Sequence, residues 1–380
     1  MLLVAALVLA IWVYLVALRG GFWLMREAPS EAPLPARVPR IAVVVPARNE
    51  AAVVGPAVKS LASQQYPGEV HIVLVDDHST DGTADAARAA APEGRLTMAT
   101  AGPLPSGWTG KLWAVSEGVR RAAALDPEYL LLSDADIVHE PHNLERLVAR
   151  AAAGGYDLVS YMATLNCRTA AERTLVPAFV FFFFMLYPPA WVSSARRRTA
   201  GAAGGCMLVR RAALERIGGV AAIRDQLIDD CALARAVKRS GGRVWLGLSR
   251  ETVSIREYGT LREIGRMVSR TAFTQLHYSW LMLAGTVIGM ALTYLAPPAL
   301  AIAGSGPARA FGAAAWALMS AAYFPVLLYY RRSPLWAPLL PLSAAFYTAA
   351  TVWSAWRWLL GAGGEWKGRV SARVKDRAKP

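Results

Sequence analysis

The sequence is poor in charged residues, and this shortage excludes two classes of protein. Only 18% of its 380 residues are charged, whereas 55% are hydrophobic. A disordered chain has the opposite balance, and an ordinary soluble domain has about a quarter of its residues charged. The formal net charge is nevertheless +14. In so apolar a chain, this excess indicates a membrane protein with cationic flanks rather than a nucleic-acid-binding protein.

Cysteine and two nucleotide-binding signatures are also scarce or missing. Cys167, Cys206 and Cys231 are too few for a disulfide framework and too widely spaced for a zinc site, so we interpret them as reduced thiols facing the cytosol. The first predicted strand is not followed by G-x-G-x-x-G, which disfavours a dinucleotide-dependent dehydrogenase. The absence of G-x-x-x-x-G-K-[ST] excludes a P-loop NTPase.

The first 25 residues are predicted to form a transmembrane anchor. The run from Met1 to Leu18 carries no charge before Arg19, and it lacks the basic start and the small-residue cleavage site of a signal peptide. Arginines follow the run on its downstream side only. By the positive-inside rule, the next domain then faces the cytoplasm, and we expect a multi-pass protein of the cytoplasmic (inner) membrane.

The C-terminal third holds three more apolar runs, at 280–304, 310–330 and 335–360, each long enough to cross a membrane as a helix. Residues 280–362 are therefore predicted as transmembrane helices, with an amphipathic membrane-proximal segment at 259–279 before them. Pro297-Pro298 should kink or end the first helix. The tail, 363–380, is basic and should stay inside, yet three crossings would place it outside. The sequence leaves this conflict open.

A further apolar stretch at 175–195 is rich in phenylalanine. It is long enough to span, but an extra crossing would separate the motifs described below. We therefore expect a helix that lies in the membrane interface, with Arg196, Arg197 and Arg198 facing anionic headgroups.

Between the anchors, residues 40–258 alternate short apolar strands with alanine-rich helices. Strands are predicted at 41–45, 72–75 and 129–132, and helices at 51–64, 83–91 and 112–125. This alternation predicts an α/β domain with a doubly wound sheet, flanked by transmembrane helices. In such folds, ligands bind beyond the carboxyl ends of the strands.

Acidic motifs follow each of these strands. They are Pro46-Ala47-Arg48-Asn49-Glu50, Asp76-Asp77-His78-Ser79-Thr80-Asp81, and Ser133-Asp134-Ala135-Asp136. Carboxylates at these positions can accept hydrogen bonds from a nucleobase or ribose. They can also hold a divalent cation that neutralises a pyrophosphate. A single motif of this kind would fit a turn or helix cap equally well. Three of them, each after a buried strand, favour a nucleotide site.

Together VVVPARNE, VDDHSTDGT, LLLSDADI, LIDDCALARAVKRSG and GWTGKLWA resemble the family 2 glycosyltransferases of GT-A fold, whose sheet is mixed. AAGGCMLVRR and TYLAPP are similar to the hopanoid-biosynthesis-associated members. The resemblance implies that Pro46, Arg48 and Glu50 line the nucleotide pocket and that Asp77 accepts a hydrogen bond from uracil. It also implies that Lys111 lies near the ribose or phosphates.

The same resemblance assigns the D-x-D motif and the later acidic pair. Asp134 would face the ribose and donor sugar, and Asp136 would bind Mg²⁺ or Mn²⁺ on the diphosphate. Asp230 would be the general base, and Asp229, in place of the usual Glu, would contact the donor. Gly204 and Gly205 are expected either to allow close backbone approach to the sugar or to form a structural turn. His139 and His142 are interpreted as an exposed loop pair rather than metal ligands.

Only one residue of the family's Q-x-x-R-W box, Arg270, is present. Arg266 and Arg270 share a helical face and either clamp the diphosphate or face the membrane as cations. The reduced box and the few spans argue against a processive polysaccharide synthase. The expected function is inverting transfer of a sugar, from a UDP-sugar, to a hopanoid or other polyisoprenoid lipid. A carotenoid, sphingolipid or polyprenyl phosphate acceptor is the alternative, and a non-catalytic scaffold is the hypothesis from another class.

Overall fold

The computed structural model describes residues 1–27, 32–361, 365–366 and 369–370. They divide into two compact units. The sheet unit consists chiefly of Arg26–Asn166 and Val192–Arg256, and the helical unit of Met1–Met25, Cys167–Trp191 and Glu257–Gly364. The predicted basic tail, 363–380, falls almost wholly outside the described residues.

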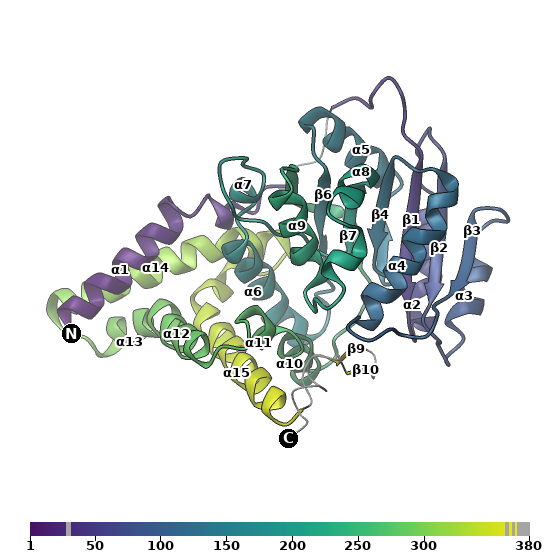
Figure 1. Cartoon of the computed structure of the whole chain (residues 1–380). Coiled ribbons are helices and arrows are strands. Elements are labelled where there is room, and N and C mark those ends of the chain that lie inside the picture. Colours follow the sequence, from purple (N-terminus) through teal and green to yellow (C-terminus); the bar gives the residue numbers. More distant parts are fainter. Residues whose placement is uncertain (28–31, 362–364, 367–368, 371–380) are drawn as a thin grey trace. The chain divides into compact units, whose positions relative to one another are not determined.

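The sheet unit is built on one mixed sheet, whose order is β3-β2-β1-β4-β7-β6-β8-β5. Figure 1 shows this order from β3 to β6. The pairs β1·β2, β2·β3, β1·β4 and β6·β8 are parallel, while β4·β7, β6·β7 and β5·β8 are antiparallel. This confirms the predicted mixed α/β sheet. The strands are β1 (Ile41–Ala47), β2 (Val70–Asp76), β3 (Leu96–Thr100), β4 (Tyr129–Ser133), β5 (Ile137–His139), β6 (Leu158–Thr164), β7 (Cys206–Arg210) and β8 (Val244–Ser254).

Helices cover both faces of this sheet. Alternate residues of β1 point to opposite faces, so Val43 contributes to the core under α2 and α5, whereas Val44 faces α4. A Cβ at Gly118 of α4 would clash with the Val44 side chain, so this glycine lets the helix lie close to the sheet. The helices are α2 (Ala51–Ala62), α3 (Thr83–Ala90), α4 (Gly110–Ala122), α5 (Asn143–Gly154), α8 (Arg211–Arg216) and α9 (Asp229–Arg239).

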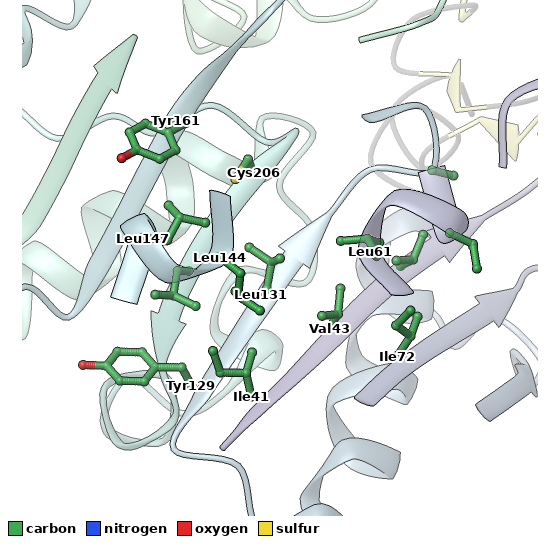
Figure 2. Close-up of a cluster of buried hydrophobic side chains, with 14 of the residues drawn as sticks. Ile41, Val43, Leu61, Ile72, Tyr129, Leu131, Leu144, Leu147, Tyr161 and Cys206 are labelled. Carbon is green, nitrogen blue, oxygen red and sulfur yellow. The ribbon is translucent and has the colours of Figure 1, made fainter. Parts of the chain in front are cut away.

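The core on the α2 and α5 face is continuous across the central strands. Figure 2 shows Val43 and Ile72 beside Leu61, and Leu131 beside Leu144. All five side chains are at most 1% exposed. Burying an aliphatic side chain of this size stabilises the fold by about 1.5–3 kcal/mol, so this face fixes the strand positions firmly.

The parallel register brings three strand ends together. Ala47 pairs with Asp76, and Val44 pairs with Leu132, so β1, β2 and β4 end at the same edge of the sheet. The loops that follow them carry the acidic motifs. This edge is where the site is expected in such a sheet.

The helical unit contains the long apolar helices. Its helices are α1 (Leu2–Ala17), α6 (Ala170–Leu186), α7 (Pro189–Val192), α10 (Leu261–Ser269), α11 (Ala272–Gln275), α12 (Trp280–Met290), α13 (Ala296–Ala303), α14 (Gly306–Tyr329) and α15 (Leu340–Leu359). Four segments are long and apolar enough to cross a membrane: Ala170–Val192, Trp280–Ala303, Gly306–Tyr329 and Pro334–Leu359. The N-terminal helix, with 16 residues, is somewhat shorter than the roughly 20 residues that span a bilayer.

Two features of this unit differ from the sequence-based expectation. The helix α6 groups with the helical unit rather than with the sheet domain, because Phe181 packs edge-to-face against Phe22 and Tyr323. Its placement in the membrane interface stays a prediction. The run around Pro297-Pro298 continues as α13, since a wider π-helical turn at Ala291–Leu295 directly precedes the prolines.

Candidate active site

Lys111 links two acidic motifs at the carboxyl edge of the sheet. Its Nζ lies 2.8 Å from Asp134 Oδ1, just after β4, and 3.1 Å from Asp229 Oδ2, in the first turn of α9. Lys111 stands in the first turn of α4, whose N-cap is Thr109. Three elements far apart in the sequence therefore meet at one ammonium group.

Burial and the ion pairs act in opposite directions on the pKa values of Lys111 and Asp134. Burial alone would lower the pKa of Lys111, but the carboxylates of Asp134 and Asp229 outweigh it and raise that pKa well above its usual value. Burial raises the pKa of Asp134, and Lys111 opposes this shift. The result is a compact cluster of charges at low solvent exposure.

Asp230 lies beside this cluster and is held by two backbone N–H groups. Gly204 N donates to Asp230 Oδ2 at 2.9 Å, and Cys231 N donates to Oδ1 at 2.6 Å. Burial, followed by the charge of Asp229, raises the pKa of Asp230 to about 6. A carboxylate with a pKa near neutrality is ionised at pH 7 and still basic enough to accept a proton.

The two glycines before β7 have different surroundings. A Cβ at Gly205 would lie 2.9 Å from Ile137 Cδ1, so an alanine here would require the buried Ile137 side chain to shift. A Cβ at Gly204 would lie 3.4 Å from Asp230 Oδ2 and 3.6 Å from Lys111 Nζ. Gly204, rather than Gly205, therefore brings the backbone up to the charged cluster, while the packing favours the structural account of Gly205.

A second cluster joins the remaining D-x-D carboxylate to the loop after β1. One nitrogen of Arg256 donates to both oxygens of Glu50 at 2.7 Å, and its Nε donates to Asp136 Oδ2 at 3.0 Å. Ser254 Oγ donates to the same Asp136 oxygen at 3.0 Å. Sequence reasoning missed Arg256 and Ser254, because no local motif marks them at the end of β8.

Asp77 lies under Arg48. Its side chain is fully buried, and Arg48 donates to its backbone carbonyl and lies 3.6 Å from its carboxylate. Direct contact of Asp77 with a base therefore requires Arg48 to move. The neighbouring loops are tied together, since Asn49 N donates to Ser79 Oγ and Asn49 Oδ1 accepts from Thr80 N.

A small cavity opens beside Lys111 and extends into the sheet unit. Pro46, Asp134, Gly204 and Asp229 contribute to its wall. The rest of the wall is mainly apolar, and consists of Leu112, Val115, Leu132, Ser133, Met207, Leu214, Val220, Ile223 and Leu233. The charged cluster therefore lies over an apolar floor, where electrostatic interactions are stronger than in water.

The remaining candidates are two arginines and two histidines. Arg266, in α10, and Arg270, directly after it, belong to the helical unit and are exposed. The interpretation of His139 as an exposed loop residue was wrong, because it lies in β5 and bonds Ser133 Oγ at 2.9 Å. Burial lowers its pKa to about 3. His142 is exposed, as expected, and pairs with Glu145 at 3.1 Å.

The carboxylates of the site could hold a divalent cation only together with oxygen ligands from a substrate. Among the residues that the structure describes, no group of three or more His, Cys, Asp or Glu side chains could hold a metal ion. Asp134 and Asp136 nevertheless supply hard oxygen ligands on one short turn. Magnesium is commonly held by one or two carboxylates together with substrate phosphates and water, and this pair fits that mode.

Residues 42–218 match the family model described as glycosyl transferase family 2. The matched range runs from β1 through β7 and includes the D-x-D motif. This match agrees with the predicted glycosyltransferase domain. The hopanoid association of that prediction is not addressed by the match.

Two curated relatives match shorter segments. An uncharacterized protein of Methanocaldococcus jannaschii is 34% identical over 118 residues, which cover 31% of this chain and 44% of the relative. The beta-monoglucosyldiacylglycerol synthase of Synechocystis sp. is 33% identical over 105 residues, which cover 21% of this chain and 22% of the relative. The chain therefore matches less than half the length of either relative.

A solved structure shares the fold over nearly the whole chain. It is the mannosyltransferase PcManGT of Pyrobaculum calidifontis in complex with GDP-Man and Mn²⁺. The likeness has a TM-score of 0.57 at 22% identity and covers 92% of this chain and 99% of the other. At this identity, the comparison establishes the likeness of fold alone.

Proposed function

We propose that this protein is a membrane-bound, metal-dependent, inverting glycosyltransferase that moves a sugar from a nucleotide donor to a lipid acceptor. The observation that carries the proposal is the meeting of Lys111, Asp134, Asp229 and Asp230 at the carboxyl edge of the sheet. The ammonium group of Lys111 is shared by the carboxylates of Asp134 and Asp229, and Asp230, whose pKa is raised, lies beside them. Such an arrangement suits group transfer better than a structural role.

In this proposal, Asp230 is the general base. The acceptor hydroxyl attacks the anomeric carbon, the bond from that carbon to the diphosphate oxygen breaks, and the hydroxyl proton passes to a carboxylate oxygen of Asp230. The N–H groups of Gly204 and Cys231 fix both carboxylate oxygens in place. Attack opposite to the leaving diphosphate inverts the anomeric centre.

The remaining side chains serve the donor. Asp134 would accept hydrogen bonds from the ribose or sugar, with Lys111 orienting it, and Pro46 and Glu50 would border the nucleotide. Asp136, with Asp134, would hold Mg²⁺ or Mn²⁺, which when bound supplies Lewis-acid neutralisation of the diphosphate. The relatives support a nucleotide-sugar donor, since the mannosyltransferase structure contains GDP-Man and Mn²⁺.

The apolar helices and one relative support a lipid acceptor. Four segments of the helical unit are long and apolar enough to cross a membrane, so the enzyme would meet acceptors at a bilayer surface. A hopanoid or other polyisoprenoid is the acceptor that the sequence motifs favour. The relative named as a monoglucosyldiacylglycerol synthase makes a glycerolipid the second candidate.

The test is sugar transfer by the full chain purified in detergent. We would supply radiolabelled UDP-glucose, UDP-N-acetylglucosamine or GDP-mannose with a hopanoid alcohol, diacylglycerol or polyprenyl phosphate, in Mn²⁺ or in EDTA. We expect a labelled lipid with one donor in Mn²⁺ only, and its loss in Asp136→Asn and Asp230→Asn.

Asp85→Asn is the matched control, because Asp85 lies on α3, where it is exposed and pairs with Arg88. It removes the same carboxylate charge away from the site and should leave transfer unchanged. If neither the lipids nor water accept sugar from any donor, in wild type and in the control variant, the protein would be a non-catalytic scaffold instead.

A further inference from the structure

Arg256 connects two carboxylates that the proposed function assigns to different tasks. It donates to both oxygens of Glu50, on the nucleotide side, and to Asp136, the metal carboxylate. The three side chains are 28%, 11% and 13% exposed, in the order Arg256, Glu50 and Asp136. Solvent therefore reaches them only partly, and charge-assisted hydrogen bonds are strong in such surroundings.

Backbone pairing between β5 and the end of β8 fixes the position of Arg256. Strands β5 and β8 are antiparallel, with Ile137 opposite Ser254. One residue further on, Ile255 N donates to the carbonyl of Asp136 at 3.0 Å. The backbone of Arg256 is thereby fixed next to the D-x-D turn, so its guanidinium is part of the site and not a mobile surface charge.

Asp136 Oδ2 already has two donors, Arg256 Nε and Ser254 Oγ, both at 3.0 Å. A divalent cation that binds this carboxylate would stand next to the guanidinium, and two positive groups at such a distance repel each other. Metal binding and the Arg256–Asp136 hydrogen bond therefore oppose each other.

We propose that Arg256 is a built-in counter-cation, which occupies Asp136 in the donor-free protein and yields it to the metal when a nucleoside diphosphate binds. This rests on the metal role of Asp136 in the proposed function. The diphosphate offers the guanidinium new oxygen partners, and the contact with Glu50 keeps Arg256 within reach of them. Metal and nucleotide then bind together, and the donor-free protein holds metal weakly.

The experiment measures Mn²⁺ binding to the full chain in detergent, from the electron paramagnetic resonance signal of free Mn²⁺, without nucleotide and with UDP or GDP. In Arg256→Gln, we expect Mn²⁺ to bind at least about tenfold more tightly without nucleotide. This factor corresponds to about 1.4 kcal/mol, near the low end for a hydrogen bond to a charged group. The increase in Mn²⁺ affinity that UDP or GDP produces should be correspondingly smaller in this variant than in wild type.

Two further variants separate competition from other effects. Arg250→Gln removes the same charge from a position within β8, where Arg250 pairs with Glu27 at 2.6 Å. It should change Mn²⁺ affinity less than about twofold, since exposed charges are screened. The double variant Glu50→Gln with Arg256→Gln keeps the local net charge. It carries the test if the single variant does not fold, and should also bind Mn²⁺ more tightly.

The outcomes distinguish this proposal from the function it rests on. Equal or weaker Mn²⁺ binding in both Arg256 variants, with wild-type binding still dependent on Asp136, overturns the counter-cation alone. If wild type binds no Mn²⁺ even with UDP or GDP, and Asp136→Asn changes nothing, the metal-dependent function fails and takes this proposal with it.

Discussion

The acid limb of the pH profile tests the role of Asp230 most directly. Burial and the neighbouring Asp229 raise its pKa to about 6, whereas an ordinary aspartate has a pKa of about 3.9. A general base works only when deprotonated. We therefore expect the rate of sugar transfer to fall as the pH is lowered through 6, well before most surface carboxylates titrate.

The size of this fall follows from the pKa. With a value of about 6, roughly nine-tenths of Asp230 is ionised at pH 7 and roughly one-tenth at pH 5, so the rate should drop about tenfold. With an ordinary aspartate pKa, the ionised fraction of Asp230 would stay above roughly nine-tenths at both pH 7 and pH 5. The measurement is single-turnover transfer from a labelled nucleotide sugar at saturating donor, between pH 5 and 8.

Two variants complete this test. Asp230→Asn should reduce transfer by about 10²–10⁴-fold, the usual contribution of a general base, while nucleoside diphosphate binding persists. Asp229→Asn should move the acid limb to lower pH, because it removes a negative charge that raises the pKa of Asp230. An acid limb that stays near 6 in Asp230→Asn would refute the assignment, since another group would then be titrating.

Three further perturbations have defined outcomes. Lys111→Met leaves two poorly exposed carboxylates unpaired and should lower the free energy of unfolding by about 2 kcal/mol, seen as a lower melting temperature in detergent at pH 7. Gly205→Ala places a Cβ 2.9 Å from Ile137 Cδ1 and should cost about 1–3 kcal/mol, whereas Gly204→Ala should melt near wild type. The buried His139, with its pKa lowered to about 3, stays neutral while the unfolded chain takes up a proton below pH 6.5. Stability should therefore fall as the pH drops from 6.5 towards 3, and His139→Gln should show a shallower fall if the assignment is correct.

The fold was predictable because its local signals are strong. The strands predicted at 41–45, 72–75 and 129–132 are β1, β2 and β4, each extended by a few residues. Continuous β-branched or leucine runs of this length, bounded by turn residues, are typical of a strand buried on both faces. The order of β5 to β8 was not predictable, since pairing between strands that are far apart in the sequence leaves no periodic trace in it.

The site was predictable where its residues follow those strands. Pro46, Asp134 and Asp229 line one cavity with Lys111, in agreement with a ligand site at the strand ends. Whether they bind a nucleotide sugar stays a prediction.

The burial of Asp77 and the position of Arg256 lay beyond sequence reasoning. Arg48 covers the Asp77 carboxylate, and the register of β5 and β8 places Arg256 next to the D-x-D turn. Both are properties of tertiary packing and not of a motif.

The balance of charge in the sheet unit explains why a nucleotide donor would need a cation there. The basic side chains described above are already paired: Lys111 with Asp134 and Asp229, Arg256 with Glu50 and Asp136, and Arg48 with Asp77. A diphosphate brings further negative charge to a site with an apolar floor, where unpaired charge is costly. Breaking these pairs to neutralise it would leave carboxylates unmatched. A divalent cation can satisfy both Asp136 and the diphosphate, and it frees Arg256 for the phosphates, so metal and donor are expected to enter the site together.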